Sequence, residues 1–314
     1  MPTNFTPDPA RVRVPATSAN LGPGFDALGL ALGLHDHVAA EVTARGVTVS
    51  VTGEGAGDLP GDERHLVVSA MRAAFDELGA QPPGLAVECV NRIPQARGLG
   101  SSSAAIVAGV LLARALVVDG ERRLDDAAVL RLAARIEGHP DNVAPCLLGG
   151  FTIAWTEPGG ARAVSLPVAD GVRPTVFVPA ERGLTAAARA ALPAAVPHGD
   201  AALSAGRAAL LVHALTAAPA LLLPATVDRL HQDYRAEGMP ATTALVTALR
   251  EAGVAAVVSG AGPTVLALTE PPAELDPGTD WQVWSLPVEA HGARVGRGRL
   301  GHAERDPVAA GRKS

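Results

Sequence analysis

Apolar and polar residues follow two different periods along this chain, and together they predict a mixture of strands and helices. Runs that are apolar at every position or every second position predict strands over residues 11–16, 37–44, 47–52, 85–90, 151–155, 163–166, 175–179, 254–259 and 264–269. Apolar residues at helical spacing predict helices over residues 65–78, 104–115, 124–136, 185–192, 201–215, 225–236 and 242–252. Residues 27–34 are apolar enough to be buried.

A glycine and serine run separates one predicted strand from the long helix after it. Gly98 and Gly100 permit backbone angles and close approaches that a side chain would block. Ser101, Ser102 and Ser103 bring hydroxyls and free N–H groups to the helix start, where the helix dipole favours an anion such as phosphate. A plain turn followed by a serine cap is the alternative interpretation.

Two common phosphate loops are excluded by residue identity. The Walker pattern needs a lysine after its last glycine, but Lys313 is the only lysine in the chain. The dinucleotide fingerprint needs a third glycine where Ser103 stands. The remaining interpretation is a loop that holds phosphate through backbone and hydroxyl groups.

The composition is that of a globular protein, because 48% of the residues are apolar. The length of 314 residues indicates one large or two medium domains. Cys89 and Cys146 are too few for a disulfide framework or a zinc cluster and are expected to be small buried residues. The formal charge is −6, although residues 291–314 are basic, so the rest of the chain is acidic. This balance argues against nucleic acid as a partner.

No apolar run reaches the roughly 20 residues that cross a bilayer. We therefore expect a cytoplasmic protein without a membrane partner. The composition further predicts a flexible arm over residues 1–10, two domains over residues 11–158 and 159–290, and a basic, disordered tail over residues 291–314.

Asn20 and Asp26 lie on a glycine-rich polar loop that is followed at once by an apolar segment. A carboxylate and an amide held on such a loop can recognise an ammonium or hydroxyl group of a small ligand. The alternative is that both residues only close turns, as Asn and Asp often do.

A second polar stretch follows the helix predicted over residues 124–136. Glu137 is a candidate Mg²⁺ ligand, because Mg²⁺ prefers one or two carboxylates together with phosphate oxygens. Asp141 or Asn142 can orient an acceptor hydroxyl or take its proton. An ordinary helix end is the alternative, and His139 taken alone is typical of a structural histidine.

Two arginines and a glycine turn complete the candidate residues. Arg189 and Arg235 lie on predicted helices, where each can clamp a carboxylate or simply face solvent. Gly260 and Gly262 belong to a tight turn between two apolar strands, and a hairpin turn is compatible with a ligand role.

Three separated motifs stand in order along the chain: P-x-x-SANLGPGFD at residues 15–26, GLGSSSA at residues 98–104 and GAGPT at residues 260–264. Together they resemble those of the GHMP kinase superfamily, which includes galactokinases, mevalonate kinases and homoserine kinases. The first motif and EGHPDNVAP at residues 137–145 look like those of the homoserine kinase branch. The resemblance covers residues 11 to about 290.

The resemblance implies an α+β, two-domain GHMP kinase fold. Its N-terminal domain would be like domain 2 of ribosomal protein S5, its C-terminal domain would be ferredoxin-like, and ATP would bind between them. It implies phosphate transfer from ATP to L-homoserine in threonine biosynthesis, with Mg²⁺ as cofactor, and a homodimer is compatible with it. The alternatives are another GHMP small-molecule kinase and a non-catalytic GHMP-fold metabolite sensor.

The resemblance also implies residue roles. The ATP-binding residues would be Pro94, Gln95, Ala96, Arg97, Gly98, Leu99, Gly100, Ser101, Ser102, Ser103, Ala104, Gly260 and Gly262. Mg²⁺ would be held by Ser101 or Ser102 with Glu137. The acceptor would be bound by Asn20, Asp26, His139, Thr185, Arg189 and Arg235, with Asn142 and Asp141 as catalytic residues.

The sequence departs from the family pattern at two places. Ala186 stands where a lysine often follows the threonine matched by Thr185. The N-terminal lysine that mevalonate kinase-like members pair with a catalytic aspartate is absent. Its absence favours a mechanism in which positioning and electrostatics dominate over a strong general base.

Overall fold

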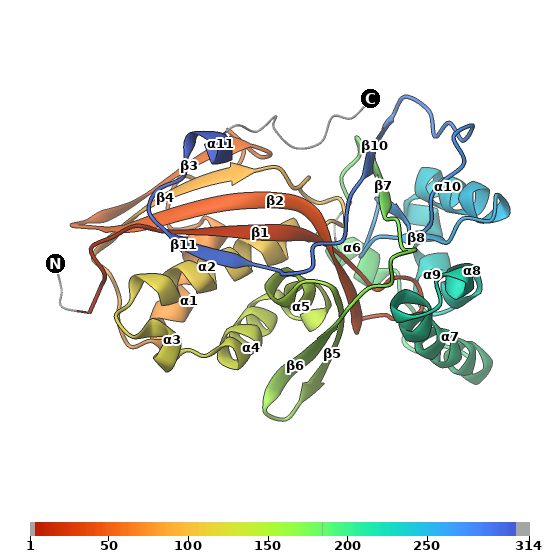
Figure 1. The fold of residues 1–314 in the computed structure, drawn as a ribbon, viewed down its shortest axis with the longest axis horizontal. Helices are drawn as coiled ribbons and strands as arrows, with labels where there is room; N and C mark the ends of the chain where they lie inside the picture. Colours follow the sequence, from red (N-terminus) through yellow and green to blue (C-terminus); the bar gives the residue numbers. More distant parts are fainter. Residues whose placement is uncertain (1–3, 184, 306–314) are drawn as a thin grey trace.

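A mixed sheet with most of its helices packed on one face makes up the larger of two lobes in this computed structural model, which describes residues 4–183 and 185–305 (Figure 1). Its strands are β1 (Ala10–Ala19), β2 (Leu28–Thr43), β3 (Gly46–Gly53), β4 (Gly84–Asn91), β5 (Phe151–Glu157), β6 (Gly160–Leu166) and β11 (Arg294–Arg297). Its helices are α1 (Leu66–Glu77), α2 (Ser101–Leu116), α3 (Gly120–Arg123), α4 (Asp126–Glu137), α5 (Pro140–Leu148) and α11 (His302–Arg305). The strand order is β11-β1-β2-β4-β3, and β5 pairs with both β2 and β6.

Side-chain periodicity and close helix packing explain how this lobe forms. In β3, Val47, Val49 and Val51 are partly buried against the core, and the two residues between them are exposed. α2 lies between the sheet and α1. Gly109 of α2 allows α1 to approach closely, because a side chain there would overlap the main-chain oxygen of Val67.

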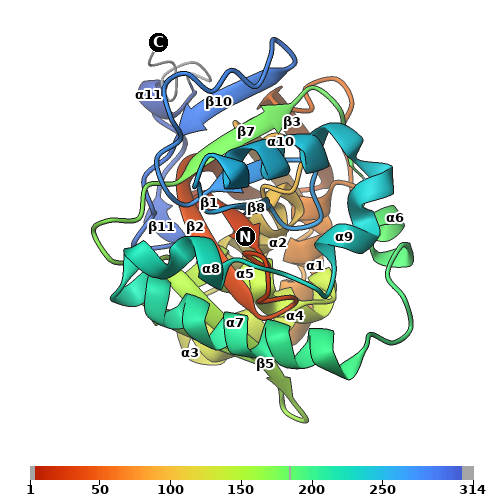
Figure 2. The same ribbon diagram turned by 90° about the vertical axis from the view of Figure 1, so that its right-hand side faces the viewer.

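The smaller lobe has an antiparallel sheet of order β10-β7-β9-β8 (Figure 2). Its strands are β7 (Thr175–Pro179), β8 (Ala256–Val258), β9 (Val265–Ala267) and β10 (Trp281–Ser285). Its α-helices are α6 (Thr185–Ala190), α7 (His198–Thr216), α8 (Leu222–Ala225), α9 (Gln232–Arg235) and α10 (Pro240–Glu251), and 3₁₀ turns lie at Pro219–Leu221 and Ala236–Gly238.

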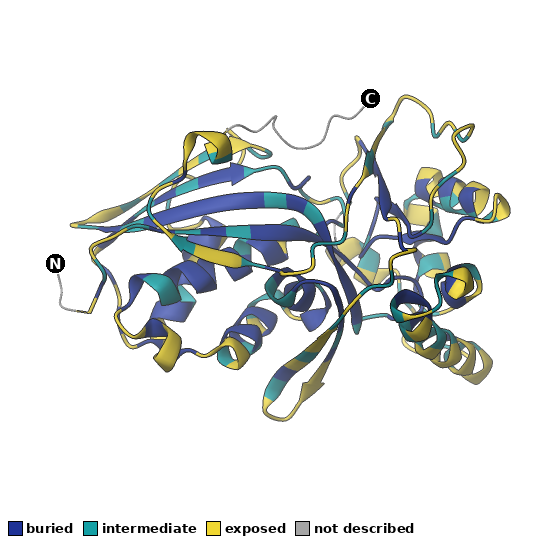
Figure 3. Ribbon diagram, in the orientation of Figure 1, coloured by how far each residue is buried: buried dark blue, intermediate teal, exposed yellow. Residues whose placement is uncertain are grey.

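The two faces of the smaller sheet belong to different cores. Val176 and Leu266 join the core of the larger lobe, whereas their neighbours Phe177 and Val265 pack in a second cluster with Leu249 of α10. In β7 and β9, successive side chains point to opposite faces of the sheet. One face therefore packs against the larger lobe, and the other packs against α10. Figure 3 shows β1, β2 and β4 of the larger sheet mostly buried and the outer surfaces of α7 and α10 exposed.

The α+β class and the two-domain organisation predicted from the sequence are confirmed. Some predicted boundaries differ from the structure. Residues 28–43 form one long strand, β2, and β6 pairs with β5, so the chain leaves the first sheet after residue 166 and not at residue 159. The helix predicted over residues 225–236 is interrupted, because the Asp228 carboxylate accepts main-chain N–H groups of residues 230–232 and starts α9.

Both ends of the described chain pack against the larger lobe. Phe5 is 7% exposed and meets Phe75 edge to face, with 5.8 Å between ring centroids. β11 pairs antiparallel with β1, and Glu304 of α11 forms an ion pair with Arg11 at 3.0 Å. The predictions of a flexible arm and a disordered tail are therefore wrong for these segments, because composition does not show that the β1 edge is free for pairing. Residues 1–3 and 306–314 lie outside the described residues.

Two smaller predictions concern cysteines and the membrane. Cys89 and Cys146 are buried and unpaired, as predicted. No helix within residues 4–183 and 185–305 is both long enough and apolar enough to cross a bilayer.

We expect Phe5→Ala to lower the free energy of unfolding by about 3 kcal/mol, because it leaves a cavity beside Phe75. Urea denaturation measures the change. The control is Trp155→Ala, at an aromatic side chain that is 41% exposed, with an expected cost below about 1 kcal/mol. Equal costs in the two variants would show that the N-terminal segment does not contribute to the core.

Candidate active site

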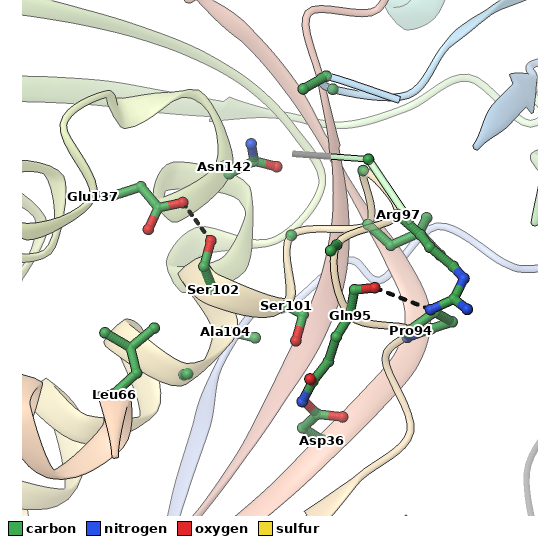
Figure 4. Close-up of a pocket in the computed structure, with 18 of the residues that line it drawn as sticks. Asp36, Leu66, Pro94, Gln95, Arg97, Ser101, Ser102, Ala104, Glu137 and Asn142 are labelled. Atoms are coloured by element: carbon green, nitrogen blue, oxygen red, sulfur yellow. Dashed lines mark hydrogen bonds between the residues drawn. The ribbon is translucent and has the colours of Figure 1, made fainter. Parts of the chain in front are cut away.

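A cavity of about 490 Å³ lies where the end of β1, the start of α2 and the smaller lobe meet. Figure 4 shows part of its wall, with Glu137 and Ser102 on one side and Pro94, Gln95 and Arg97 on the other. Both lobes contribute residues, since Arg189, Arg235 and Gly260 complete the lining. The cavity is therefore built from segments that are far apart in the sequence.

The loop before α2 is fixed by hydrogen bonds from three neighbouring segments. They come from the end of β1, the loop before α6 and the strand turn at residues 259–264. The bonds are Thr17 N–H to Leu99 O (3.0 Å), Gly183 N–H to Ala96 O (2.7 Å), Thr264 N–H to Arg97 O (3.2 Å) and Ser259 Oγ to Gly98 O (2.6 Å). The motifs at residues 15–26 and 260–264 thus hold the motif at residues 98–104 in place.

The N-terminus of α2 faces the cavity without a side-chain cap among the described residues. The first helical hydrogen bond runs from Ala104 N–H to Gly100 O at 2.9 Å, so the N–H groups of Ser101, Ser102 and Ser103 precede it. Gly100 has φ 71°, and a side chain there would overlap the Thr17 hydroxyl. The arrangement is a seat for an anion such as phosphate.

Glu137, the last residue of α4, lies beside this seat. Its Oε1 atom accepts hydrogen bonds from the Ser102 hydroxyl at 2.7 Å and the Ser103 hydroxyl at 2.9 Å. Ser101 lines the cavity, but within the described residues Glu137 is bonded to the other two serines. One carboxylate with hydroxyl oxygens beside a phosphate seat fits the ligand preference of Mg²⁺.

The start of α5 presents three polar side chains to the cavity. The His139 Nδ1 atom lies 2.5 Å from Oδ1 of Asp141, which is only 2% exposed. This hydrogen bond raises the pKa of His139 above its usual value. The third, Asn142, has its Oδ1 atom occupied by a hydrogen bond from the buried Thr17 hydroxyl at 2.8 Å.

Asn20 and Asp26 line the same cavity and lie close together. Asn20 donates from Nδ2 to Gly260 O at 2.8 Å and accepts the Asp26 N–H at 3.0 Å. Asp26 forms a two-bond ion pair with Arg189, at 2.9 and 3.0 Å. The Arg189 guanidinium also lies 5.7 Å from the centroid of Phe25.

Arg235 is 4% exposed and is held by the groups around it. Its Nε–H donates to Ala188 O at 3.0 Å, and a terminal nitrogen donates to Nδ1 of His231 at 3.0 Å. His231 donates from Nε2 to Gly22 O at 2.9 Å and stacks on Phe25. Burial lowers the pKa of His231, so the ring is neutral and its Nδ1 atom serves as an acceptor.

The recess behind the phosphate loop has a different lining. Asp36 accepts the main-chain N–H groups of Arg92 at 2.6 Å and Ile93 at 2.9 Å, and burial raises the pKa of Asp36 to about 7. His65 caps α1 by accepting the Val67 N–H. The sequence gives no motif for this recess, because its residues come from ordinary strand and helix ends.

Most of the residues selected from the sequence line this one cavity: Asn20, Asp26, Pro94, Gln95, Ala96, Arg97, Gly98, Leu99, Gly100, Ser101, Ser102, Ala104, Glu137, His139, Asp141, Asn142, Arg189, Arg235 and Gly260. Ser103 lies behind the wall and bonds to Glu137, and Gly262 packs against the Gly98 backbone. The Thr185 side chain lies outside what the structure describes. Sequence reasoning missed Thr17, Phe25 and His231, although the first two lie within the first motif.

Comparisons with known proteins agree with this arrangement. The families "GHMP kinases N terminal domain" and "GHMP kinases C terminal" match residues 65–150 and 201–277. The chain is 61% identical to the homoserine kinase of Streptomyces coelicolor over 91% of this chain and 94% of that protein. It is similar to the crystal structure of homoserine kinase from Cytophaga hutchinsonii, with a TM-score of 0.77 and 27% identity, over 92% and 97% of the two chains. A putative homoserine kinase from Listeria monocytogenes has a TM-score of 0.71 and 32% identity, over 93% and 100%.

We expect Gly100→Ala to lower the affinity for a nucleoside triphosphate by about 100-fold, because the new methyl group meets the Thr17 hydroxyl and displaces the start of α2. Calorimetric titration measures the affinity. Gly46→Ala is the matched control, since Gly46 has a similar φ of 72° but open space around it. An unchanged affinity in Gly100→Ala would contradict the assignment of the phosphate seat.

Proposed function

Because the chain belongs to the GHMP kinase family, and within it to the homoserine kinases, we infer that it transfers the terminal phosphoryl group of ATP to the hydroxyl of L-homoserine. The product is O-phospho-L-homoserine, which places the enzyme in threonine biosynthesis. We further propose Mg²⁺ as its metal, the cytoplasm as its compartment and a homodimer as its assembly, on the strength of the family alone.

One observation carries the choice of substrate: paired charges of opposite sign line the same cavity as the phosphate seat. Asp26 and Arg189 form an ion pair in the cavity. The guanidinium groups of Arg189 and Arg235 both lie against the ring of Phe25. An amino acid is a zwitterion that matches this pair, with its ammonium on Asp26 and its carboxylate on the two arginines.

We assign the transfer step mainly to positioning and electrostatic stabilisation. The N–H groups at the start of α2 bind phosphate oxygens, and Asn142 contacts the acceptor oxygen from α5. Asp141 is our candidate for taking the proton, and its hydrogen bond to His139 keeps both groups oriented. A loose phosphoryl-transfer transition state needs little general-base assistance, which agrees with the absence of a lysine in this part of the sequence.

The residues around Glu137 fit a divalent cation. Glu137, Ser102 and one further serine hydroxyl would hold Mg²⁺ with the phosphates of ATP. The bound ion would neutralise charge on the phosphate oxygens during transfer. The protein itself keeps the carboxylate in place by means of the two serine hydrogen bonds.

Assays of ADP production with L-homoserine, mevalonate and galactose test the function. We expect homoserine to be preferred by several orders of magnitude in kcat/KM, because neither of the other compounds carries an ammonium group for Asp26. Preference for mevalonate or galactose would defeat the substrate assignment. Tight ATP binding without ADP production from any of the three would instead favour a metabolite sensor.

We expect Asp26→Asn to lower kcat/KM for homoserine by about 100-fold, because it removes the charge that pairs with the ammonium group. Its ATP affinity, measured by titration, should change by less than about threefold. Asp126→Asn is the matched control, since it breaks an ion pair with Arg114 outside the cavity. Equal losses for ATP and homoserine in Asp26→Asn would contradict the role of this residue.

A further inference from the structure

We propose that Thr17 is a positioning residue that fixes the side-chain amide of Asn142, so that its NH₂ group faces the acceptor oxygen as a hydrogen-bond donor. This inference rests on the proposed function. Thr17 is fully buried and does not line the cavity, whereas Asn142 does. Any influence of the Thr17 hydroxyl on the reaction therefore passes through its neighbours.

Thr17 bonds to both halves of the reaction site. Its main-chain N–H donates to Leu99 O of the phosphate loop at 3.0 Å, and its hydroxyl donates to Asn142 Oδ1 at 2.8 Å. The hydroxyl also lies where a side chain on Gly100 would be. One residue of a rigid central strand thus sets the position of the acceptor amide relative to the phosphate seat.

The hydrogen bond also decides which end of the Asn142 amide faces the substrate. A threonine hydroxyl has one proton to donate. Within the described residues, the Thr17 hydroxyl donates this proton to Asn142 Oδ1. With the amide reversed, Nδ2 would donate to the Thr17 oxygen, but the buried hydroxyl proton would lose the acceptor that Asn142 provides, at a cost of about 1–3 kcal/mol. Oδ1 is therefore turned toward Thr17, and the NH₂ group remains for the cavity.

A donor at this position has a specific chemical consequence. An NH₂ group can bind a lone pair of the acceptor oxygen and leave the hydroxyl proton free to move away as the O–P bond forms. It can also stabilise the oxygen atoms of the transferring phosphoryl group. It has no lone pair with which to take a proton. The geometry thus assigns Asn142 to orientation and charge stabilisation, and leaves proton transfer to other groups.

The test compares Thr17→Val, Thr17→Ser, Asn142→Ala and the double variant Thr17→Val/Asn142→Ala. Valine keeps the shape and the backbone bond to Leu99 but removes the hydroxyl. We expect Thr17→Val to lower kcat by about 10- to 100-fold, with KM for ATP within about twofold of wild type. Thr17→Ser, which restores the donor, should recover kcat to within about threefold. Thr17→Val should cause no further loss in the Asn142→Ala background.

A second measurement uses Asn142→Asp, which keeps an oxygen for Thr17 but exchanges the donor NH₂ group for a second acceptor. We expect its kcat to fall at least as far as that of Asn142→Ala, because a carboxylate repels the phosphoryl oxygens. This measurement tests the donor assignment of Asn142 even if Thr17→Val does not fold, and Thr17→Ser then still tests the Thr17 hydroxyl. A kcat equal to or above wild type in Asn142→Asp would overturn the donor assignment.

The matched control is Thr152→Val, at a second fully buried threonine of the same sheet that lies outside the cavity lining. We expect it to lower the unfolding temperature and to leave kcat within about twofold. Three results would overturn the proposal: wild-type kcat in Thr17→Val, equal loss in Thr17→Ser, or full additivity with Asn142→Ala. Failure of the wild-type protein to phosphorylate homoserine would be seen before any variant is compared, and it would overturn the proposed function together with this inference.

Discussion

The main-chain N–H groups at the start of α2 have no partners within the helix, and the site depends on leaving them free. Gly98 and Gly100 bring the chain into the helix at positive φ without side chains, so nothing covers the first turn. The end of β1 and the turn at residues 259–264 hold this loop in place by hydrogen bonds. A phosphate group can then bind with little structural change, because the donors are already oriented.

The acceptor site that we propose combines one buried arginine with a partly exposed ion pair. Arg235 is buried and held by hydrogen bonds to Ala188 and a neutral His231, and it lines the cavity. Arg189 is more exposed and pairs with Asp26, and in our proposal this ion pair opens to admit a zwitterion. A rigid arginine beside an exchangeable ion pair suits recognition of an amino acid between two lobes.

The candidate site could largely be predicted from the sequence where its residues form local motifs. The glycines before α2, Asn20 and Asp26 on the first loop, and Glu137 to Asn142 all stand within short stretches of unusual composition. Arg189 and Arg235 needed the family resemblance, because a single arginine on a helix is usually a surface group. His231 and Thr17 were missed, because their roles are hydrogen bonds to residues far away in the chain.

The periods of apolar residues by themselves determined most strands and helices, because each element must bury one face whatever its neighbours are. They did not determine that Phe5 and β11 pack on the larger lobe, or that β6 pairs with β5. Those outcomes depend on a free strand edge and a free apolar surface, and both exist only after the sheet has formed. The orientation of the Asn142 amide likewise depends on the tertiary structure, because its partner Thr17 lies 125 positions away in the sequence.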